Sequence, residues 1–176
     1  MRMLPCLLLA ACTQAAAPPQ VHAPAPEPEA VEHISTLDPA LEPLRGLIGA
    51  WEGGDPERHS TGRFTLKPDL FGKVLVRRNS NDSPKGRHED LMIVFHAQGG
   101  LRASYFDNEG LVIEYAIVAS GDHIEMLSDE VPNQPRFKLS YDLHGTGELA
   151  IDFSMAMPGS TEFKHYTGGV VHRVRS

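Results

Sequence analysis

The sequence predicts an all-β protein: a single up-and-down antiparallel β-barrel of about ten strands with a short N-terminal helix. The first observation is a two-residue alternation of apolar and polar side chains, which is typical of strands with one buried face. It is clearest over residues 110–119, 135–143 and 147–157. The second is a turn sequence rich in Gly, Asn or Asp about every ten residues, which favours hairpins between neighbouring strands. The third is the scarcity of long connections, which favours a barrel over a two-sheet sandwich, because closure removes exposed edges.

The first element expected in the domain is the short helix. Asp38 suits the N-cap and Pro39 the first helical position, and leucines recur at helical spacing through Leu47. Gly46 and Gly49 end the pattern. The strands expected after it lie near residues 50–54, 61–67, 72–80, 88–97, 101–107, 110–119, 122–128, 135–143, 147–157 and 162–174. The connection from Asn79 to Asp90 is the one long polar connection expected.

The N-terminus has the pattern of a secretion signal. A basic start and a short leucine-rich stretch lead to Leu9-Ala10-Ala11-Cys12. This run resembles the lipobox of bacterial lipoproteins, which implies cleavage after residues 1–11 and a lipid on the thiol of Cys12. The stretch is too short to span a bilayer, which needs about 20 apolar residues. Thr13 follows the cysteine in place of Asp, which resembles the outer-membrane sorting rule. We therefore expect a lipid-anchored protein of the cell envelope, on the outer membrane and facing the periplasm.

Residues 12–37 are expected to form a tether, because they are rich in Pro and Ala and have little to bury. Residues 38–176 then suit one domain. The formal net charge is −7 and no basic run exceeds two residues, which argues against nucleic acid as a partner. Cys6 would leave with the signal peptide, so no disulfide framework is expected.

The first expected strand carries Gly49-Ala50-Trp51-Glu52-Gly53. This resembles the G-x-W motif of lipocalins and their relatives, the calycin group, and the G-x-W-x-G of nitrobindin-like haem-binding barrels. The resemblance implies that Trp51 plugs one end of the barrel. It also implies that an arginine of the last strand, Arg173 or Arg175, stacks on the indole. The alternative is an ordinary core tryptophan. The run Tyr105-Phe106-Asp107-Asn108-Glu109-Gly110 resembles a group of bacterial lipocalin-like barrels of unassigned function, and we interpret it as a hairpin turn.

Barrels of this size can enclose one small molecule, so the expected function is binding of a small apolar or amphipathic ligand. The residues expected to line such a cavity, or to form plain core, are Met92, Ile113, Tyr115, Met126, Phe137, Tyr141, Phe153 and Met155. One alternative is a structural or interaction lipoprotein with a filled barrel and no small ligand. The other is haem binding: the nitrobindin resemblance implies one histidine ligand near the C-terminus, which His165 or His172 could match. These two lie on opposite faces of a regular strand unless a bulge at Gly168-Gly169 intervenes.

Catalytic chemistry finds little support in the sequence. There is no Gly-x-Ser-x-Gly elbow, no His-Glu-x-x-His pattern and no zinc-type cysteine pair. Glu114 and Asp152 are carboxylates that could meet in a cavity or face solvent. His88-Glu89-Asp90 stands at a strand start and is interpreted as a solvated edge. Enzymatic activity is left open, with binding favoured over catalysis; we name no catalytic or metal-binding residue and leave the cofactor unknown.

Overall fold

The computed structural model describes residues 36–55, 59–145 and 147–175. The expected signal peptide, Cys12 and nearly all of the expected tether lie outside the described residues. The elements in chain order are the 3-10 helix η1 (Pro39–Leu47), β1 (Gly49–Asp55), β2 (Ser60–Asp69), the 3-10 turn η2 (Leu70–Gly72), β3 (Val74–Ser83), β4 (Gly86–Ala97), β5 (Gly100–Asp107), β6 (Val112–Ser120), β7 (His123–Ser128), β8 (Arg136–His144), β9 (Glu148–Ala156) and β10 (Lys164–Arg173).

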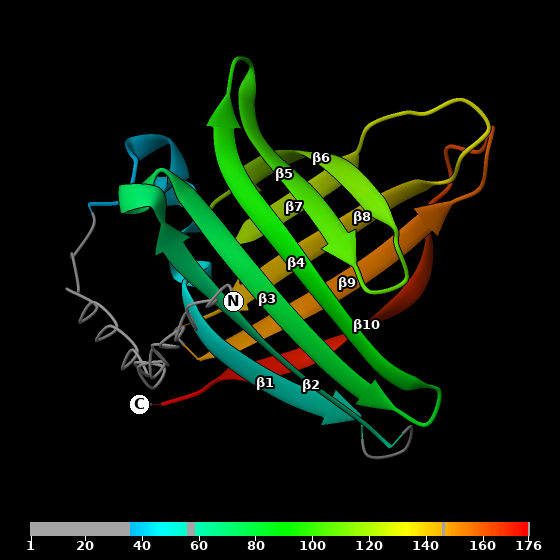
Figure 1. The fold of residues 1–176 in the computed structure, drawn as a ribbon, viewed down its shortest axis with the longest axis horizontal. Coiled ribbons are helices and arrows are strands. Elements are labelled where there is room, and N and C mark those ends of the chain that lie inside the picture. The colour runs from blue at the N-terminus through cyan, green and yellow to red at the C-terminus, as the bar shows by residue number, and fades with distance from the viewer. Residues whose placement is uncertain (1–35, 56–58, 146, 176) are drawn as a thin grey trace, which may run out of the picture. The chain divides into compact units, whose positions relative to one another are not determined.

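The ten strands form one closed antiparallel barrel, which confirms the predicted fold class (Figure 1). Each strand pairs with the next one along the chain, and β1 pairs with β10 to close the ring. The short turns expected from the sequence make these pairings possible. The helix η1 and the turn η2 lie at one end of the barrel, and the β3–β4 and β5–β6 turns lie at the other.

The expectation of a long polar connection between Asn79 and Asp90 is wrong. The two residues are paired, and the pairing of β3 with β4 continues to Ser83 and Gly86. The tip of this hairpin is polar because solvent reaches both of its faces. Asn81, which has the same parity as the inward Arg77 and Asn79, is exposed.

The helix η1 covers one end of the barrel interior. The Asp38 side chain accepts a hydrogen bond from the Ala40 amide at 3.0 Å, as expected of an N-cap. Three leucines of the helix are buried in the core. Leu37, the last residue of the expected tether, is buried with them. Gly46 allows close packing, because a Cβ there would lie 2.8 Å from the Leu143 side chain.

The core is densest near η1 and thins toward the other end. Next to the helix, the inward side chains of Leu75, Val94, Ile124 and Leu149 are buried. Within the described residues, no helix has the length and apolar character needed to cross a bilayer.

Candidate functional site

Trp51 closes the base of the barrel. Its side chain is 0% exposed and its indole N–H donates to the Leu47 carbonyl at 2.9 Å. Arg173 on β10 is paired with Trp51 and places its guanidinium 4.2 Å from the ring centre. The same guanidinium donates to the carbonyls of Gly46 and Ile48 at 2.6 Å. Helix, first strand and last strand therefore meet at one indole. Arg175 lies beyond the end of β10 and is exposed.

A charged pair lies inside the barrel above this base. Arg77 of β3 and Asp90 of β4 form an ion pair at 2.6 Å, with side chains only 10% and 3% exposed. Arg77 also donates to the hydroxyl of Tyr141 on β8. Burial by itself would lower the pKa of Arg77, but the interactions with Tyr141 and Asp90 outweigh it, so that pKa is raised. Burial also raises the pKa of Tyr141. Arg77 is thus a fixed cation in the interior.

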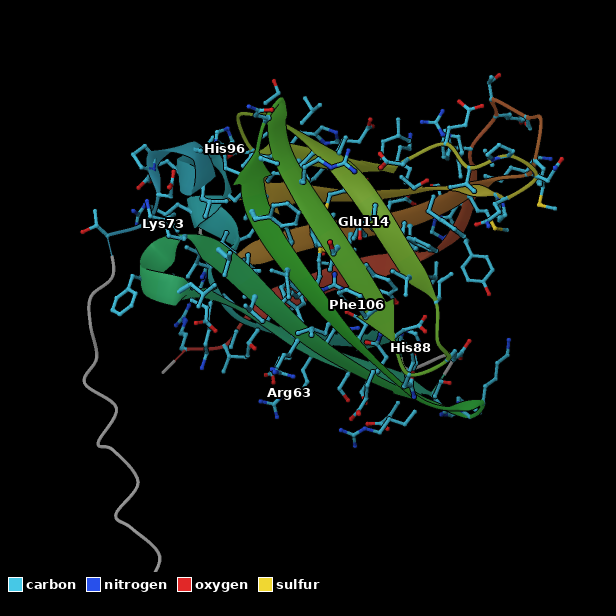
Figure 2. All side chains as sticks on the ribbon, turned by 45° about the horizontal axis from the view of Figure 1, so that its top comes forward. Arg63, Lys73, His88, His96, Phe106 and Glu114 are labelled. Atoms are coloured by element: carbon cyan, nitrogen blue, oxygen red, sulfur yellow. The ribbon has the colours of Figure 1, made fainter. Side chains whose placement is uncertain are left out.

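Polar side chains continue from this pair toward the open end. Asn79 donates to the second Asp90 oxygen at 2.7 Å. His88 lies 3.1 Å from the Tyr105 hydroxyl through Nε2 and 3.7 Å from Asp90. The His88 side chain is 33% exposed, and it lies at the end of β4 away from η1 (Figure 2). We call Asn79, His88 and Tyr105 the polar wall.

The sequence interpretation missed this wall. The solvated edge expected for His88-Glu89-Asp90 is right for Glu89 and wrong for the other two residues, which point inward. A signal was available: Asp90 stands two residues before Met92 and Arg77 two residues after Leu75, at inward positions of the same strands. A charged residue in register with an apolar strand face indicates an interior polar group.

An aromatic row faces the lumen from β8–β10. The rings of Phe137 and Phe153 stack with centroids 5.8 Å apart, and Tyr166 meets Phe153 edge-on at 6.1 Å. The pairing of β9 with β10 shifts between His165 and Thr167, so Tyr166 is the extra residue of a bulge. We call Phe137, Phe153 and Tyr166 the aromatic wall.

Glycines form the remaining part of the inner surface. Gly53 of β1 pairs with Gly62 of β2 and with Val171 of β10. Gly169, two residues before the inward Val171, pairs with the inward Ile151, so it also faces the lumen. A Cβ built on Gly169 would meet nothing within 4 Å. No side chain fills the lumen from this position.

Inward positions at this end are therefore open to solvent. Thr167 and Gly169 are exposed, and Ile151, Phe153 and Met155 are only half-buried. Because β10 pairs with β1 only from Val171 onward in the described ranges, Thr167 and Gly169 can be exposed along this unpaired stretch as well as to the lumen. We call the half of the lumen away from η1, between the polar and aromatic walls, the cup; several of its inward residues are half-buried or exposed.

The eight residues expected to line a cavity all face inward, in two groups. Met92, Ile113, Tyr115, Met126 and Tyr141 are buried, whereas Phe137, Phe153 and Met155 are half-buried. A space of about 10 Å³ lies among the deeper side chains, near the lower limit for a single water molecule. The deep half is therefore packed core.

The two histidines considered for haem lie on the outer surface. His165 forms a hydrogen bond with Asp152 at 2.5 Å, and His172 lies 4.0 Å from Glu148. The bulge at Tyr166 places them on the same outer face, and it lies two residues before the Gly168-Gly169 bulge considered from the sequence. Asp152 is therefore outward, and Glu114 is exposed and accepts a hydrogen bond from Ser104. In the described part of the chain, no three His, Cys, Asp or Glu side chains gather to hold a metal ion.

The fold is a ten-stranded antiparallel barrel with η1 packed at one end and partly exposed inward residues at the other. No protein-family model matches the chain, and no curated protein matches it. Among solved structures, the chain is similar to the crystal structure of Rv2717c from M. tuberculosis. The two share 17% sequence identity with a TM-score of 0.56, over 80% of this chain and all of the other. At this identity the similarity shows the barrel fold alone.

Proposed function

We propose that the barrel binds a small amphipathic molecule in the open half of its lumen. The observation that carries this proposal is the exposure of inward residues in this half of the barrel, above all Thr167 and Gly169 on the part of β10 that extends past β1. Pockets of this kind, with apolar walls and a few placed polar groups, are the usual sites for small ligands.

The two walls indicate the character of the ligand. Phe137 and Phe153 offer ring faces to an apolar or aromatic part. His88 and Tyr105, opposite them, offer hydrogen bonds to a polar group. A purely apolar ligand would leave the polar wall without hydrogen-bond partners on the ligand, which costs affinity. An amphipathic ligand satisfies both walls.

The buried ion pair supports the polar wall. Asp90 accepts hydrogen bonds from Arg77 on one oxygen and from Asn79 on the other. Asn79 is therefore held in place before a ligand arrives, which lowers the ordering cost of binding. Buried ion pairs add little stability over an apolar core, so a role in recognition is a reason for the pair to be here.

The test uses N-phenyl-1-naphthylamine, an uncharged aromatic amine that fluoresces in apolar surroundings. The wild-type chain should bind it saturably at one site. Gly169→Phe should weaken binding by about tenfold or more, equivalent to 1.4 kcal/mol, because the new ring occupies the cup. The backbone of Gly169 is not in the left-handed region and a Cβ meets open space, so this variant should fold.

The matched control is Val170→Phe, which places the same ring on the outer face one residue further along β10. Val170 is exposed and pairs with Ala150. It should leave the affinity for the probe unchanged. Equal affinity in the wild type and in both variants would place the probe outside the lumen and overturn the proposal, as would a failure of the wild-type protein to bind.

We also propose that the barrel is tethered to the cell envelope through a lipid on Cys12, on the outer membrane facing the periplasm. The lipobox-like run and the proline-rich residues 12–37 support this. Cys12→Ser should move the protein from the membrane fraction to the soluble fraction of the host. Retention of this variant in the membrane fraction would contradict the lipid anchor.

A further inference from the structure

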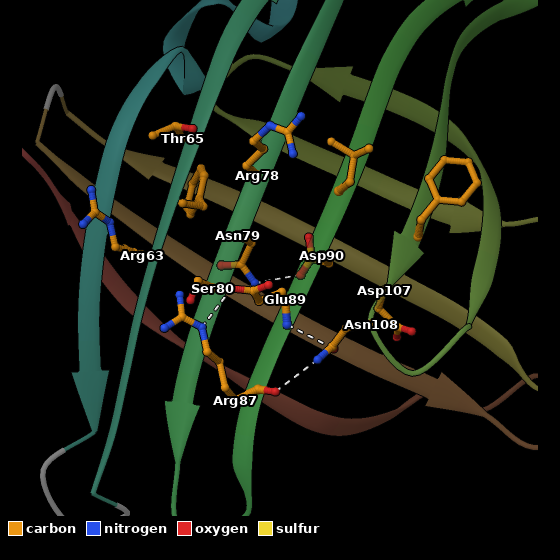
Figure 3. Close-up of a pocket in the computed structure, with 13 residues that line it drawn as sticks. Arg63, Thr65, Arg78, Asn79, Ser80, Arg87, Glu89, Asp90, Asp107 and Asn108 are labelled. Carbon is orange, nitrogen blue, oxygen red and sulfur yellow. Dashed lines mark hydrogen bonds and ion pairs between the residues drawn. The ribbon is translucent and has the colours of Figure 1, made fainter. Parts of the chain in front are cut away.

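A groove on β2–β5 is lined mainly by outward residues, and its lining also includes Phe64, Asn79 and Asp90 of the inward side. Its volume is about 560 Å³. Figure 3 shows its side chains on neighbouring strands. Cross-strand pairing arranges them in rows: Thr65, Arg78, Leu91 and Phe106 form one row, and Arg63 and Ser80 stand beside each other in the next. These outward residues alternate along their strands with the inward ones.

The groove is lined by three arginines, Arg63, Arg78 and Arg87, and by three acidic residues, Glu89, Asp90 and Asp107. Arg63 and Arg78 are exposed, and neither forms an ion pair or a side-chain hydrogen bond with any residue in the described ranges. Arg87, at the rim, pairs with Glu89 at 2.8 Å, and these two charges cancel. Asp90 pairs with Arg77, and the Asp107 carboxylate accepts hydrogen bonds from the amides of Glu109 and Leu111. Arg63 and Arg78 are therefore the groove cations that no described residue of opposite sign contacts.

The guanidinium groups of Arg63 and Arg78 point apart in Figure 3, so both reach one anion only if the two side chains turn toward each other. Arg63 pairs with Ser80, which is two residues from Arg78 on the same face. Such diagonal neighbours stand about 7–8 Å apart, within reach of long side chains. Arginine suits phosphate because its planar fork donates two parallel hydrogen bonds. The hydroxyls of Ser80 and Thr65 lie in the same groove as further donors.

An apolar floor continues the groove beyond the arginines. Leu91 pairs with Arg78 on one side and with Phe106 on the other, and Phe106 is exposed. Figure 2 shows Arg63 and Phe106 on their separate strands. We propose that this groove binds a phosphate ester, with the phosphate held by Arg63 and Arg78 and an apolar or aromatic substituent lying over Leu91 and Phe106.

The experiment titrates the full-length chain with phenyl phosphate in a calorimeter, with phenol as the uncharged comparison. Phenyl phosphate should bind saturably and phenol should not. Arg63→Gln and Arg78→Gln should each weaken binding by about tenfold or more, because each removes charge-assisted hydrogen bonds. Arg45→Gln, which alters an exposed arginine on η1, should leave it unchanged. Binding should also weaken as salt is raised.

A second arm identifies the source of the phosphate. Vesicles of phosphatidylglycerol are compared with vesicles of phosphatidylcholine in a sedimentation assay. Sedimentation with phosphatidylglycerol alone, lost in Arg63→Gln and Arg78→Gln, would assign the groove to a lipid headgroup. Binding of phenyl phosphate without sedimentation would assign it to a soluble phosphate ester. No binding in either arm, or equal binding by the two groove variants and the wild type, would overturn the proposal. None of these results depends on the lumen being a binding site.

Discussion

Removing one partner of the Arg77–Asp90 pair should destabilise the barrel strongly. In Arg77→Met the Asp90 carboxylate, 3% exposed, loses its ion-pair partner and the Tyr141 hydroxyl loses its donor. Breaking a buried pair typically costs about 3–5 kcal/mol. Asn79 still donates to Asp90, so we expect a loss near the lower end of that range. Asp90→Leu leaves the Arg77 cation with only the Tyr141 oxygen, so we expect a loss near the upper end.

The double variant separates two contributions to the free energy of unfolding: the penalty for burying the two charges and the attraction between them. Arg77→Met with Asp90→Leu removes both charges and fills the space with apolar groups. Such replacements are often neutral, or stabilising by about 1–4 kcal/mol. The double variant should therefore be at least as stable as the wild type, while its affinity for N-phenyl-1-naphthylamine changes because Asn79 has lost its acceptor.

Urea unfolding measures these differences, with fluorescence of the single tryptophan, Trp51, as the probe. Asp90→Asn, a milder change, serves if a single variant does not fold. An Arg77→Met variant within about 1 kcal/mol of the wild type would refute the reasoning, since it would mean that water already reaches the carboxylate. A double variant as unstable as the sum of the two single variants would show that the charges do not interact.

Three further outcomes follow from the packing. Trp51→Ala should lower the free energy of unfolding by about 3–5 kcal/mol because the indole is fully buried, and Arg173→Met should lose about 0.5–2 kcal/mol of stacking. Urea unfolding followed by circular dichroism measures both, and an unchanged midpoint for Trp51→Ala would rule out the plug. Burial raises the pKa of Tyr141, so the unfolded chain releases that phenolic proton at lower pH than the folded chain. The contribution of Tyr141 to the free energy of unfolding is therefore fully present below about pH 10. Above that pH it falls by about 1.4 kcal/mol per pH unit, until the pH reaches the pKa of Tyr141 in the folded protein. Tyr141→Phe should make stability less steeply dependent on pH above 10 in urea titrations, and an identical slope would contradict this. Gly72→Ala should destabilise the protein more than Gly99→Ala. Both glycines have a positive φ, but only at Gly72 would a Cβ crowd another atom, because it would lie 2.5 Å from the Thr36 carbonyl oxygen. Thermal melts rank the two variants, and equal losses would count against this contact.

The strand pattern was predictable because burial on one face leaves a period of two in the sequence. The last strand was expected near 162–174 and spans Lys164–Arg173. The pattern failed at the tip of the β3–β4 hairpin, because no face is buried there and alternation has no cause. The contact between Arg173 and Trp51 was expected from a family resemblance; nothing in the local sequence specifies it.

The candidate sites were harder to predict because they depend on register between strands. Arg77 and Asp90 become partners only when β3 and β4 pair, and the inner glycines meet only through β1, β2 and β10. The outer groove combines Arg63 and Arg78, which are unremarkable as exposed residues of separate strands. A single sequence shows which face a residue occupies, but cross-strand neighbours follow from turn geometry and closure of the ring.

The ring is joined unevenly around its circumference. Within the described residues, β1 and β10 pair at three positions, from Trp51–Arg173 to Gly53–Val171, whereas β3 and β4 pair at ten. Lys164 to Val170 therefore run past β1 without pairing to it. On heating, β1 and β10 should separate before the other strand pairs. The separation should start at the end of the barrel away from η1 and proceed toward Trp51. A ligand too large to enter through the end of the barrel could then enter the cup sideways, between β1 and β10. The contact of Arg173 with Trp51 would limit how far the two strands separate.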